Sequence, residues 1–275
     1  MKKLLYVARD IIFFGITYIV ASLVVGVAAG NIEGIATPDG NFTSIGLMLS
    51  FFTTMILLYL LLSYYERRHY AACLPIERNQ GGFDPITILW GVILLMSTSV
   101  LILPLSDYLP TDDRSFQSDE WTLLTTVIIA PILEEYIFRG RLMSLFQHNM
   151  PPSAATMLTA AIFALSHGFS IVTINAFVAG IIFGYIYILR RSIVAPILLH
   201  MCNNAMAYAM MVLSYREQTL EEIVDSSVSN TTIYLAATAI LIAGIAHISI
   251  TLRRADRHAR TTAIDDSIST AEVEE

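Results

Sequence analysis

Eight apolar runs, each close to the length of a membrane-crossing helix, dominate this sequence of 275 residues. A helix needs roughly 20 mostly apolar residues to cross the hydrocarbon core of a bilayer. The runs cover residues 11–29, 45–65, 86–105, 121–138, 153–167, 171–189, 193–213 and 232–252. The fifth run is short, and the fourth and seventh carry polar residues. The pattern predicts an all-α, polytopic membrane protein with eight transmembrane helices.

The composition favours the same class of protein. Hydrophobic residues make up 55% of the chain and charged residues 14%, and the mean hydropathy is +0.64. A soluble domain carries about 25% charged residues. The runs lack the period-2 alternation of a transmembrane barrel, the other structure that satisfies its backbone in lipid. The formal net charge of −7 indicates little about a partner, and no nucleic acid is expected.

The distribution of Lys and Arg predicts how the chain is oriented in the bilayer. With a cytoplasmic N-terminus and eight alternating spans, 14 of the 16 basic residues fall in cytoplasmic segments. Only Arg114 and Arg216 fall in outer loops. A bias of this kind orients membrane helices. We therefore expect a multi-pass protein of the cell membrane with both termini in the cytoplasm.

The chain divides into one integral membrane domain, residues 1–260, and a cytoplasmic tail, residues 261–275. The tail is polar and acidic without an apolar period, which is typical of disorder. Residues 140–150 have apolar side chains at helical spacing, which predicts a short helix at the cytoplasmic interface. Three side chains form its apolar side: Leu142, Leu145 and Phe146.

Two consecutive carboxylates, Glu134 and Glu135, lie inside the fourth run. An ionisable group at the bilayer centre costs roughly 2.5–3.5 kcal/mol on insertion scales. Glu135 and Arg139 are at positions i and i+4, neighbours on one helix face, which predicts a structural ion pair. Consecutive helical residues point about 100° apart, so Glu134 cannot share that pair equally well. Glu134 is therefore the candidate functional carboxylate.

Three further polar side chains lie inside or at the ends of the runs. His167 ends the fifth run, a place where an isolated histidine is more often an interfacial residue. His200 and Asn204, at i and i+4 in the seventh run, put an imidazole and an amide on one face. That pair alone suits a packing hydrogen bond as well as a functional role. Together with Glu134, the three supply the groups needed to activate a water and stabilise an oxyanion.

Depth in the membrane is a check on this grouping. Counted from the predicted cytoplasmic ends of the helices, Glu134 lies at roughly 8 Å, His200 at roughly 12 Å and Asn204 at roughly 18 Å. His167 lies at roughly 21 Å on the same count. It joins the others only if its helix is tilted or begins deeper than the run suggests. The remaining histidines are assigned no role in the site: His69, His148, His247 and His258.

Three short motifs resemble the CPBP family, which comprises CAAX proteases and bacteriocin-processing enzymes and is also called Abi. The motifs are EEYIFR at residues 134–139, FALSH at 163–167 and HMCNN at 200–204. They occupy a core of about residues 121–210 in the expected order, each in a predicted membrane helix. Any one of the motifs is common, but the combination of all three is specific.

The resemblance implies a CAAX-type intramembrane endopeptidase, conventionally called a metalloprotease. By analogy with the family, Glu134 acts as general base with His167 and polarises a water for attack on a peptide carbonyl. His200 and Asn204 stabilise the resulting oxyanion. Glu135 and Arg139 support the site by holding the helix and the base in place.

Whether a metal takes part is open at this point. Glu134, His167 and His200 are plausible zinc ligands, and they are the set that would hold Zn²⁺ if it is used. The sequence has no His-Glu-x-x-His helix, and a metal-free mechanism based on glutamate needs no other residues. The sequence therefore predicts no certain cofactor and names Zn²⁺ as the possible one.

The expected substrate is a membrane-embedded peptide or protein, bacteriocin precursors among them, cut within the lipid bilayer. The alternative is a non-catalytic membrane regulator or bacteriocin-immunity protein that acts by binding a partner membrane protein. A small-solute transporter is less favoured, because the polar residues form one patch and no inverted repeat is evident.

Overall fold

The structure, a computed structural model, describes residues 2–37, 41–70, 76, 84–102, 104–105, 108–109, 119–214 and 230–273. Within these ranges the chain is helical and contains no named β-strand, which confirms the all-α prediction for the described residues. The helices are α1 (Lys2–Gly30), α2 (Ser44–Tyr70), α3 (Pro85–Ile102), α4 (Glu120–Leu124), η2 (Thr125–Ile129), α5 (Ala130–Ile137), η3 (Phe138–Leu142), α6 (Met143–Gln147), α7 (Pro152–Leu165), α8 (Ile171–Arg190), α9 (Val194–Ser214) and α11 (Asn230–Val273).

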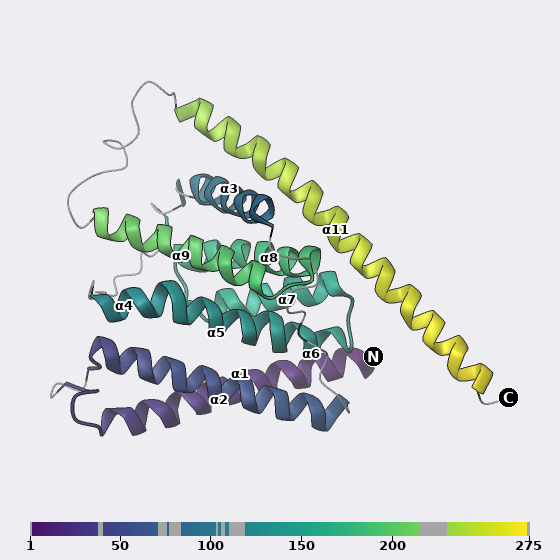
Figure 1. Cartoon of the computed structure of the whole chain (residues 1–275), viewed down its shortest axis with the longest axis horizontal. Helices are drawn as coiled ribbons and strands as arrows, with labels where there is room; N and C mark the ends of the chain where they lie inside the picture. The colour runs from purple at the N-terminus through teal and green to yellow at the C-terminus, as the bar shows by residue number, and fades with distance from the viewer. Residues whose placement is uncertain are drawn as a thin grey trace.

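The helices form a bundle in which most neighbours along the chain run antiparallel (Figure 1). α1 and α2 pair on one side of the bundle, and α2 also packs against α5. The segment from α4 to α6 lies next to this pair and contacts α9. α7 and α8 form the most extensive helix pair, and α3 and α11 cover the opposite side of the bundle.

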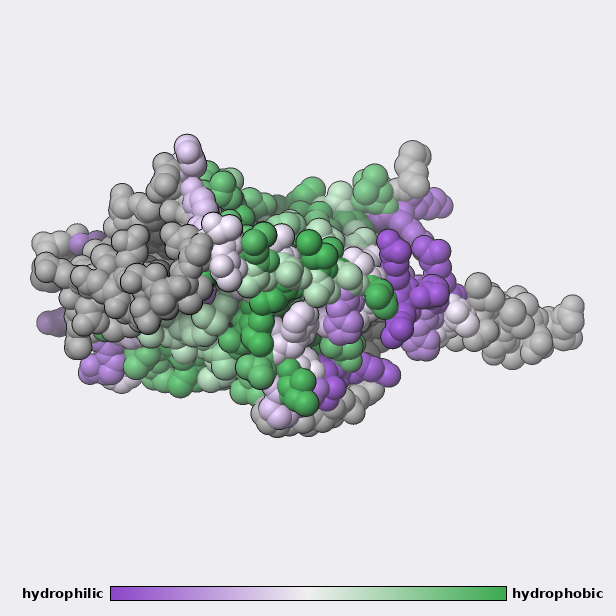
Figure 2. Space-filling model, turned by 90° about the horizontal axis from the view of Figure 1, so that it is seen from above, coloured by the Kyte–Doolittle hydropathy of each residue, from purple (hydrophilic) through white to green (hydrophobic). Residues whose placement is uncertain are grey.

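Among the described residues, six helices are long and apolar enough to cross a membrane: Lys2–Gly30, Ser44–Tyr70, Pro85–Ile102, Glu120–Gln147, Ile171–Arg190 and Thr231–Thr262. Large apolar side chains point outward from them, as Ile12 and Ile16 do on α1. Hydrophobic residues cover the middle of the face in Figure 2, and hydrophilic residues gather toward its right-hand end. The protein is therefore a multi-pass membrane protein.

The predicted number of eight spans is confirmed only in part. α7, which corresponds to the fifth run, has 14 residues and is about 21 Å long, shorter than the hydrocarbon core of about 30 Å. α9, which corresponds to the seventh run, has 21 residues but is interrupted by polar groups. Length and composition therefore support six of the eight predicted crossings.

The predicted interfacial helix at residues 140–150 is not a separate element. One continuous helix runs from Glu120 to Gln147, and the apolar face of its last turns is buried in the protein. Leu142 and Phe146 have no exposed surface and Leu145 has almost none. No proline interrupts the helix after Arg139, and its apolar face packs in the core against α7. The periodicity correctly predicted a helix with one apolar face. That face packs in the protein core, however, and not against the membrane surface as expected.

Helix α11 continues to Val273, past the start of the tail that was predicted to be disordered from residue 261. The segment from Arg253 to Val273 contains neither glycine nor proline, so nothing in its backbone stops the helix. The polar, acidic composition identified where the apolar part of the helix ends, but not where the helix itself ends.

Both termini lie at the same end of the bundle (Figure 1), as an even number of crossings requires. Arg139 and Arg141, which the topology count assigned to a cytoplasmic segment, are buried in the helix. Of the other twelve residues counted on that side from the sequence, Arg78 lies outside the described residues. The sequence bias persists without Arg139 and Arg141. That this end faces the cytoplasm stays a prediction from the distribution of Lys and Arg.

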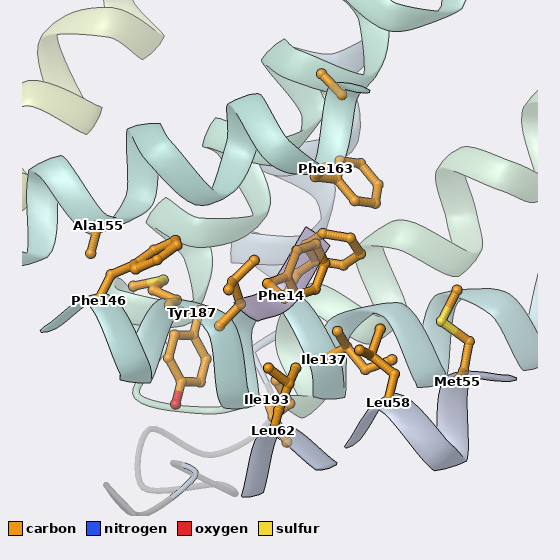
Figure 3. Close-up of a cluster of buried hydrophobic side chains, with 14 of the residues drawn as sticks. Phe14, Met55, Leu58, Leu62, Ile137, Phe146, Ala155, Phe163, Tyr187 and Ile193 are labelled. Atoms are coloured by element: carbon orange, nitrogen blue, oxygen red, sulfur yellow. The ribbon is translucent and has the colours of Figure 1, made fainter. Parts of the chain in front are cut away.

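The main hydrophobic cluster lies where α1, α2, α5, η3, α6 and α7 meet (Figure 3). In this cluster Leu58 of α2 lies beside Ile137 of the long helix, and Phe146 of the same helix lies beside Ala155 of α7. This cluster fixes the long helix against α7, and both of them carry residues of the candidate site.

A buried polar group of side chains joins α1 and α2 to α6. The Asp10 carboxylate accepts hydrogen bonds from the hydroxyls of Tyr65, at 2.7 Å, and Tyr70, at 2.5 Å. The Glu66 carboxylate accepts from Ser144, at 2.7 Å, and forms an ion pair with Arg141, at 3.1 Å. Buried carboxylates require such partners, and these bonds fix the depth of α6 relative to the first helix pair.

Candidate active site

The two consecutive glutamates lie near the middle of the long helix, on the regular turns of α5. Glu134 comes thirteen residues before Gln147, which places it about 20 Å from that end of the helix. His167 follows directly after α7, which is about 21 Å long and starts near the same end. The two depths agree because the helix continues to Gln147 and does not end near Arg139. His167 therefore needs no special tilt to join the site.

π-helical segments flank α5 on both sides, η2 before it and η3 after it. Such segments are frequent at functional sites. η2 has a cause in the sequence, because Pro131 has no N–H to donate. The Ala130 N–H donates to the carbonyl of Thr125, five residues back. The carbonyl of Thr126 would accept from Ala130 in an α-helix or from residue 131 in a π-helix. Neither bond forms, because Ala130 donates to Thr125 and Pro131 has no N–H.

Asn204 on α9 supplies the missing donor. Its Nδ2 donates to the Thr126 carbonyl at 3.0 Å. Its Oδ1 accepts a hydrogen bond from Asn203 Nδ2 at 3.2 Å. The amide nitrogen of Asn204 carries two hydrogens, and one of them remains available after the bond to Thr126.

The predicted ion pair between Glu135 and Arg139 is present, with Glu135 Oε1 2.9 Å from Arg139 Nη1. Both side chains are buried, and Arg139 Nη2 also donates to the carbonyl of Gly180 on α8 at 2.9 Å. The same Glu135 Oε1 lies 2.9 Å from Nδ1 of His200 on α9. Glu135 therefore connects α5, α8 and α9.

This contact determines how His200 faces Glu134. Because a carboxylate only accepts, Nδ1 of His200 carries the proton in the bond to Glu135. The other ring nitrogen, Nε2, then faces Glu134 Oε2 at 3.7 Å. That distance is too long for a direct hydrogen bond and suits a bridging water. The Glu134 side chain is 13% exposed and that of His200 3%, so the pair is nearly closed off from its surroundings.

His167 reaches the site from the end of α7. Its Nδ1 lies 2.8 Å from the carbonyl of Phe163, which can only accept. Nδ1 is therefore the protonated nitrogen, and Nε2 is left with a free lone pair. The structure thus pairs Glu134 with His200 across α5 and α9. Asn204 lies one turn further along α9, and His167 reaches the edge of the pair, next to the Phe163 ring that also contacts His200.

Two aromatic side chains that the sequence did not single out for a role hold the imidazoles in place. The Phe163 ring contacts the rings of His167 and His200, with centroids 4.7 and 5.8 Å away, and the Arg139 guanidinium lies 5.0 Å from its centroid. Phe183 of α8 stacks on His200 at 4.7 Å. Phe163 was recognisable only through the FALSH motif, and no pattern pointed to Phe183. The contact between Glu135 and His200 joins two helices and has no local signal in sequence.

The donor geometry does not match a metal centre. Within the described residues, no three His, Cys, Asp or Glu side chains lie close enough together to hold an ion. Glu134 Oε2 and His200 Nε2 approach each other to 3.7 Å, but among the described side chains no third donor joins them. The predicted set of Glu134, His167 and His200 therefore does not form a ligand cage, and no catalytic step below is routed through a metal.

These features define a multi-pass helical membrane protein with a Glu–His site buried at mid-depth. Residues 116–206 match the family described as type II CAAX prenyl endopeptidase Rce1-like. That range contains all six residues selected from the sequence. The match confirms the resemblance of this core to the CPBP family of CAAX proteases, and it supports a protease.

Two relatives are similar to parts of the chain. The membrane-embedded CAAX protease MroQ of Staphylococcus aureus is 33% identical over 94 residues, which span 32% of this chain and 38% of MroQ. An uncharacterised 24.3 kDa protein of Escherichia coli is 28% identical over 162 residues, 53% of this chain and 73% of that protein. No solved structure matches the chain. The similarity to MroQ thus covers well under half of that protein.

Proposed function

We propose that this protein is an intramembrane endopeptidase that hydrolyses a peptide bond in a membrane-associated peptide or protein. The observation that carries the proposal is the position of Glu134 Oε2, 3.7 Å from the Nε2 atom of His200. The other face of that imidazole is held by a buried carboxylate. In the proposed orientation, the end of the bundle with both termini faces the cytoplasm.

Glu134 acts as the general base. A water bound between the Glu134 carboxylate and the imidazoles loses a proton to Glu134 as its oxygen attacks the peptide carbonyl carbon. His167 helps to orient this water through the lone pair on Nε2, which the Phe163 carbonyl leaves free by binding Nδ1. When the C–N bond breaks, the proton on Glu134 passes to the leaving amine. One water is consumed, and one carboxyl and one amine are formed.

His200 and Asn204 stabilise the oxyanion of the tetrahedral intermediate. Asn204 offers the hydrogen that is not used by Thr126. His200 turns its Nε2 side toward the oxyanion, and Glu135 holds the ring from the Nδ1 side. Donors fixed before the reaction stabilise developing charge without reorganisation. Glu135 and Arg139 act through His200 and are positioning residues, since neither faces the water between Glu134 and His200.

The test compares Glu134→Gln with Glu135→Gln in the full chain reconstituted in liposomes with a library of membrane peptides. Newly formed peptide ends are identified by mass spectrometry, and folding is followed by thermal unfolding. Glu134→Gln should abolish cleavage at an unchanged melting temperature. Glu135→Gln should lower both the rate of cleavage and the melting temperature, because removing one partner of a buried ion pair costs about 3–5 kcal/mol of stability.

The two glutamates are matched controls for each other, since each substitution removes one negative charge from the same helix turn. Equal and mild effects of both would contradict the assigned roles. A protein that cleaves nothing, and whose cellular phenotype survives Glu134→Gln, would replace the protease with the alternative of a partner-binding membrane regulator.

A further inference from the structure

A cavity of about 530 Å³ lies between α11 and the ends of α6, α7 and α8, and Glu134 is not among its lining residues. Its basic residues include Arg191 and Arg254, with His258 as a further donor. Arg139 also contributes to the wall, but Glu135 balances its charge. No carboxylate is among the described residues that line this cavity, called the Arg254 cavity below.

An acidic residue near the cavity is engaged elsewhere. Asp256, two residues after Arg254 on α11, accepts hydrogen bonds from the backbone N–H of Ser153, at 2.9 Å, and from its hydroxyl, at 2.5 Å. Asp256 thus binds the first turn of α7 and fixes α11 beside it. Among the described residues that line the Arg254 cavity, basic side chains are present and acidic ones are not.

Arg191 provides a second, independent indication. It ends α8 with φ at +46°, the only positive φ of a non-glycine residue among those described. Glycine would adopt this left-handed conformation without the steric penalty of a Cβ. An outlier of this kind is a reason to look for a function of the side chain. Arg191 lines the Arg254 cavity, so its side chain would contact a ligand bound there.

The remaining wall residues indicate the kind of anion. Ile188, Leu189 and Ala255 make one part of the wall apolar, whereas Gln147 and Thr251 add polar groups. The cavity is at the ends of apolar helices, since Gln147 ends α6, Pro152 begins α7 and Arg191 caps α8. A cationic and apolar cavity at this level suits a phosphate that is attached to acyl chains better than a free ion.

We infer that the Arg254 cavity binds the headgroup of an anionic phospholipid, with the phosphate contacted by Arg191 and Arg254. The site is distinct from the Glu134 site, and the inference does not depend on the proposed peptidase activity. It backs onto Arg139, so a bound headgroup lies at one end of the chain of contacts that leads through Glu135 to His200.

The test measures thermal unfolding of the full chain in detergent as phosphatidylglycerol, phosphatidylcholine or inorganic phosphate is added. Phosphatidylglycerol should raise the melting temperature more than the other two. Arg254→Gln should need roughly fivefold more phosphatidylglycerol for the same shift, as expected for the loss of one basic contact. Arg257→Gln is the matched control, because it removes the same charge from the same helix outside the cavity.

Arg191→Gly keeps the test independent of misfolding. It removes the guanidinium and also the left-handed strain, so the lipid-free protein should stay folded while the response to phosphatidylglycerol falls. Equal responses of Arg254→Gln and Arg257→Gln would overturn the inference. So would a wild-type protein that phosphatidylcholine or inorganic phosphate stabilises as strongly as phosphatidylglycerol does.

Discussion

The bond between Asn204 and the Thr126 carbonyl predicts that the stability and the activity contributed by Asn204 can be separated. Asn204→Ala removes the donor to a carbonyl that Pro131 has left without a helical partner. An unsatisfied buried backbone group costs about 1–3 kcal/mol. The same substitution removes the proposed oxyanion donor, a loss that lowers kcat about 100- to 1,000-fold in enzymes where it has been measured.

Pro131→Ala restores an N–H at the position from which it can reach Thr126. In the Pro131→Ala background the Thr126 carbonyl no longer depends on Asn204. Asn204→Ala should then lower the free energy of unfolding by well under 1 kcal/mol, whereas in the wild type it should lower it by about 1–3 kcal/mol. The double variant should therefore recover the melting temperature that Asn204→Ala loses. It should not recover peptide cleavage, because an N–H inside the helix cannot replace the amide at the oxyanion.

The assay is a double-mutant cycle with two readouts, thermal unfolding and the rate of cleavage, on the four proteins in the same lipid. A cost of Asn204→Ala that is the same in the wild type and in the Pro131→Ala background would refute the explanation of the π-helical segment. Cleavage restored together with stability would show that Asn204 only positions the helix and would remove it from the proposed oxyanion site.

Two further predictions concern helix packing and metal dependence. A Cβ on Gly184 would lie 2.7 Å from Thr156 Cγ2 on α7, so Gly184→Ala should separate α7 from α8 and lower the melting temperature, with a cost of about 1–3 kcal/mol. Gly26→Ala, where nothing lies within 4 Å, is the control and should be neutral or stabilising; a similar loss in both would contradict the packing argument. Because the described donors form no ligand cage, we expect cleavage to survive dialysis against a chelator. Activity lost on chelation and restored by Zn²⁺ would show that Glu134, His167 and His200 regroup around an ion.

Local patterns in the sequence were enough to predict an all-helical membrane protein and to select candidate site residues. Long apolar runs predicted the helices, since in lipid the backbone must satisfy itself and a helix does so within one segment. The i,i+4 spacing predicted the ion pair of Glu135 and Arg139, which the structure confirms at 2.9 Å. These predictions succeeded because each depends on residues within one or two turns of each other.

Errors arose where the environment of a helix, and not its periodicity, was in question. The apolar face of Leu142 and Phe146 fits a membrane surface and a protein core equally well, and only packing against α7 distinguished the two. The depth of Glu134 was underestimated for the same reason, because the helix was expected to end near Arg139. The roles of the six site residues remain predictions.

The sequence by itself determined that this chain forms membrane helices and that Glu134 is not neutralised by its own helix, because both properties follow from spacing along one segment. Only the tertiary structure decided that Glu135 turns His200 toward Glu134 and that Asn204 completes the backbone at Thr126. The partners in those two contacts are 65 and 78 positions apart in the chain. No local pattern encodes them, since they depend on which faces α5 and α9 turn toward each other.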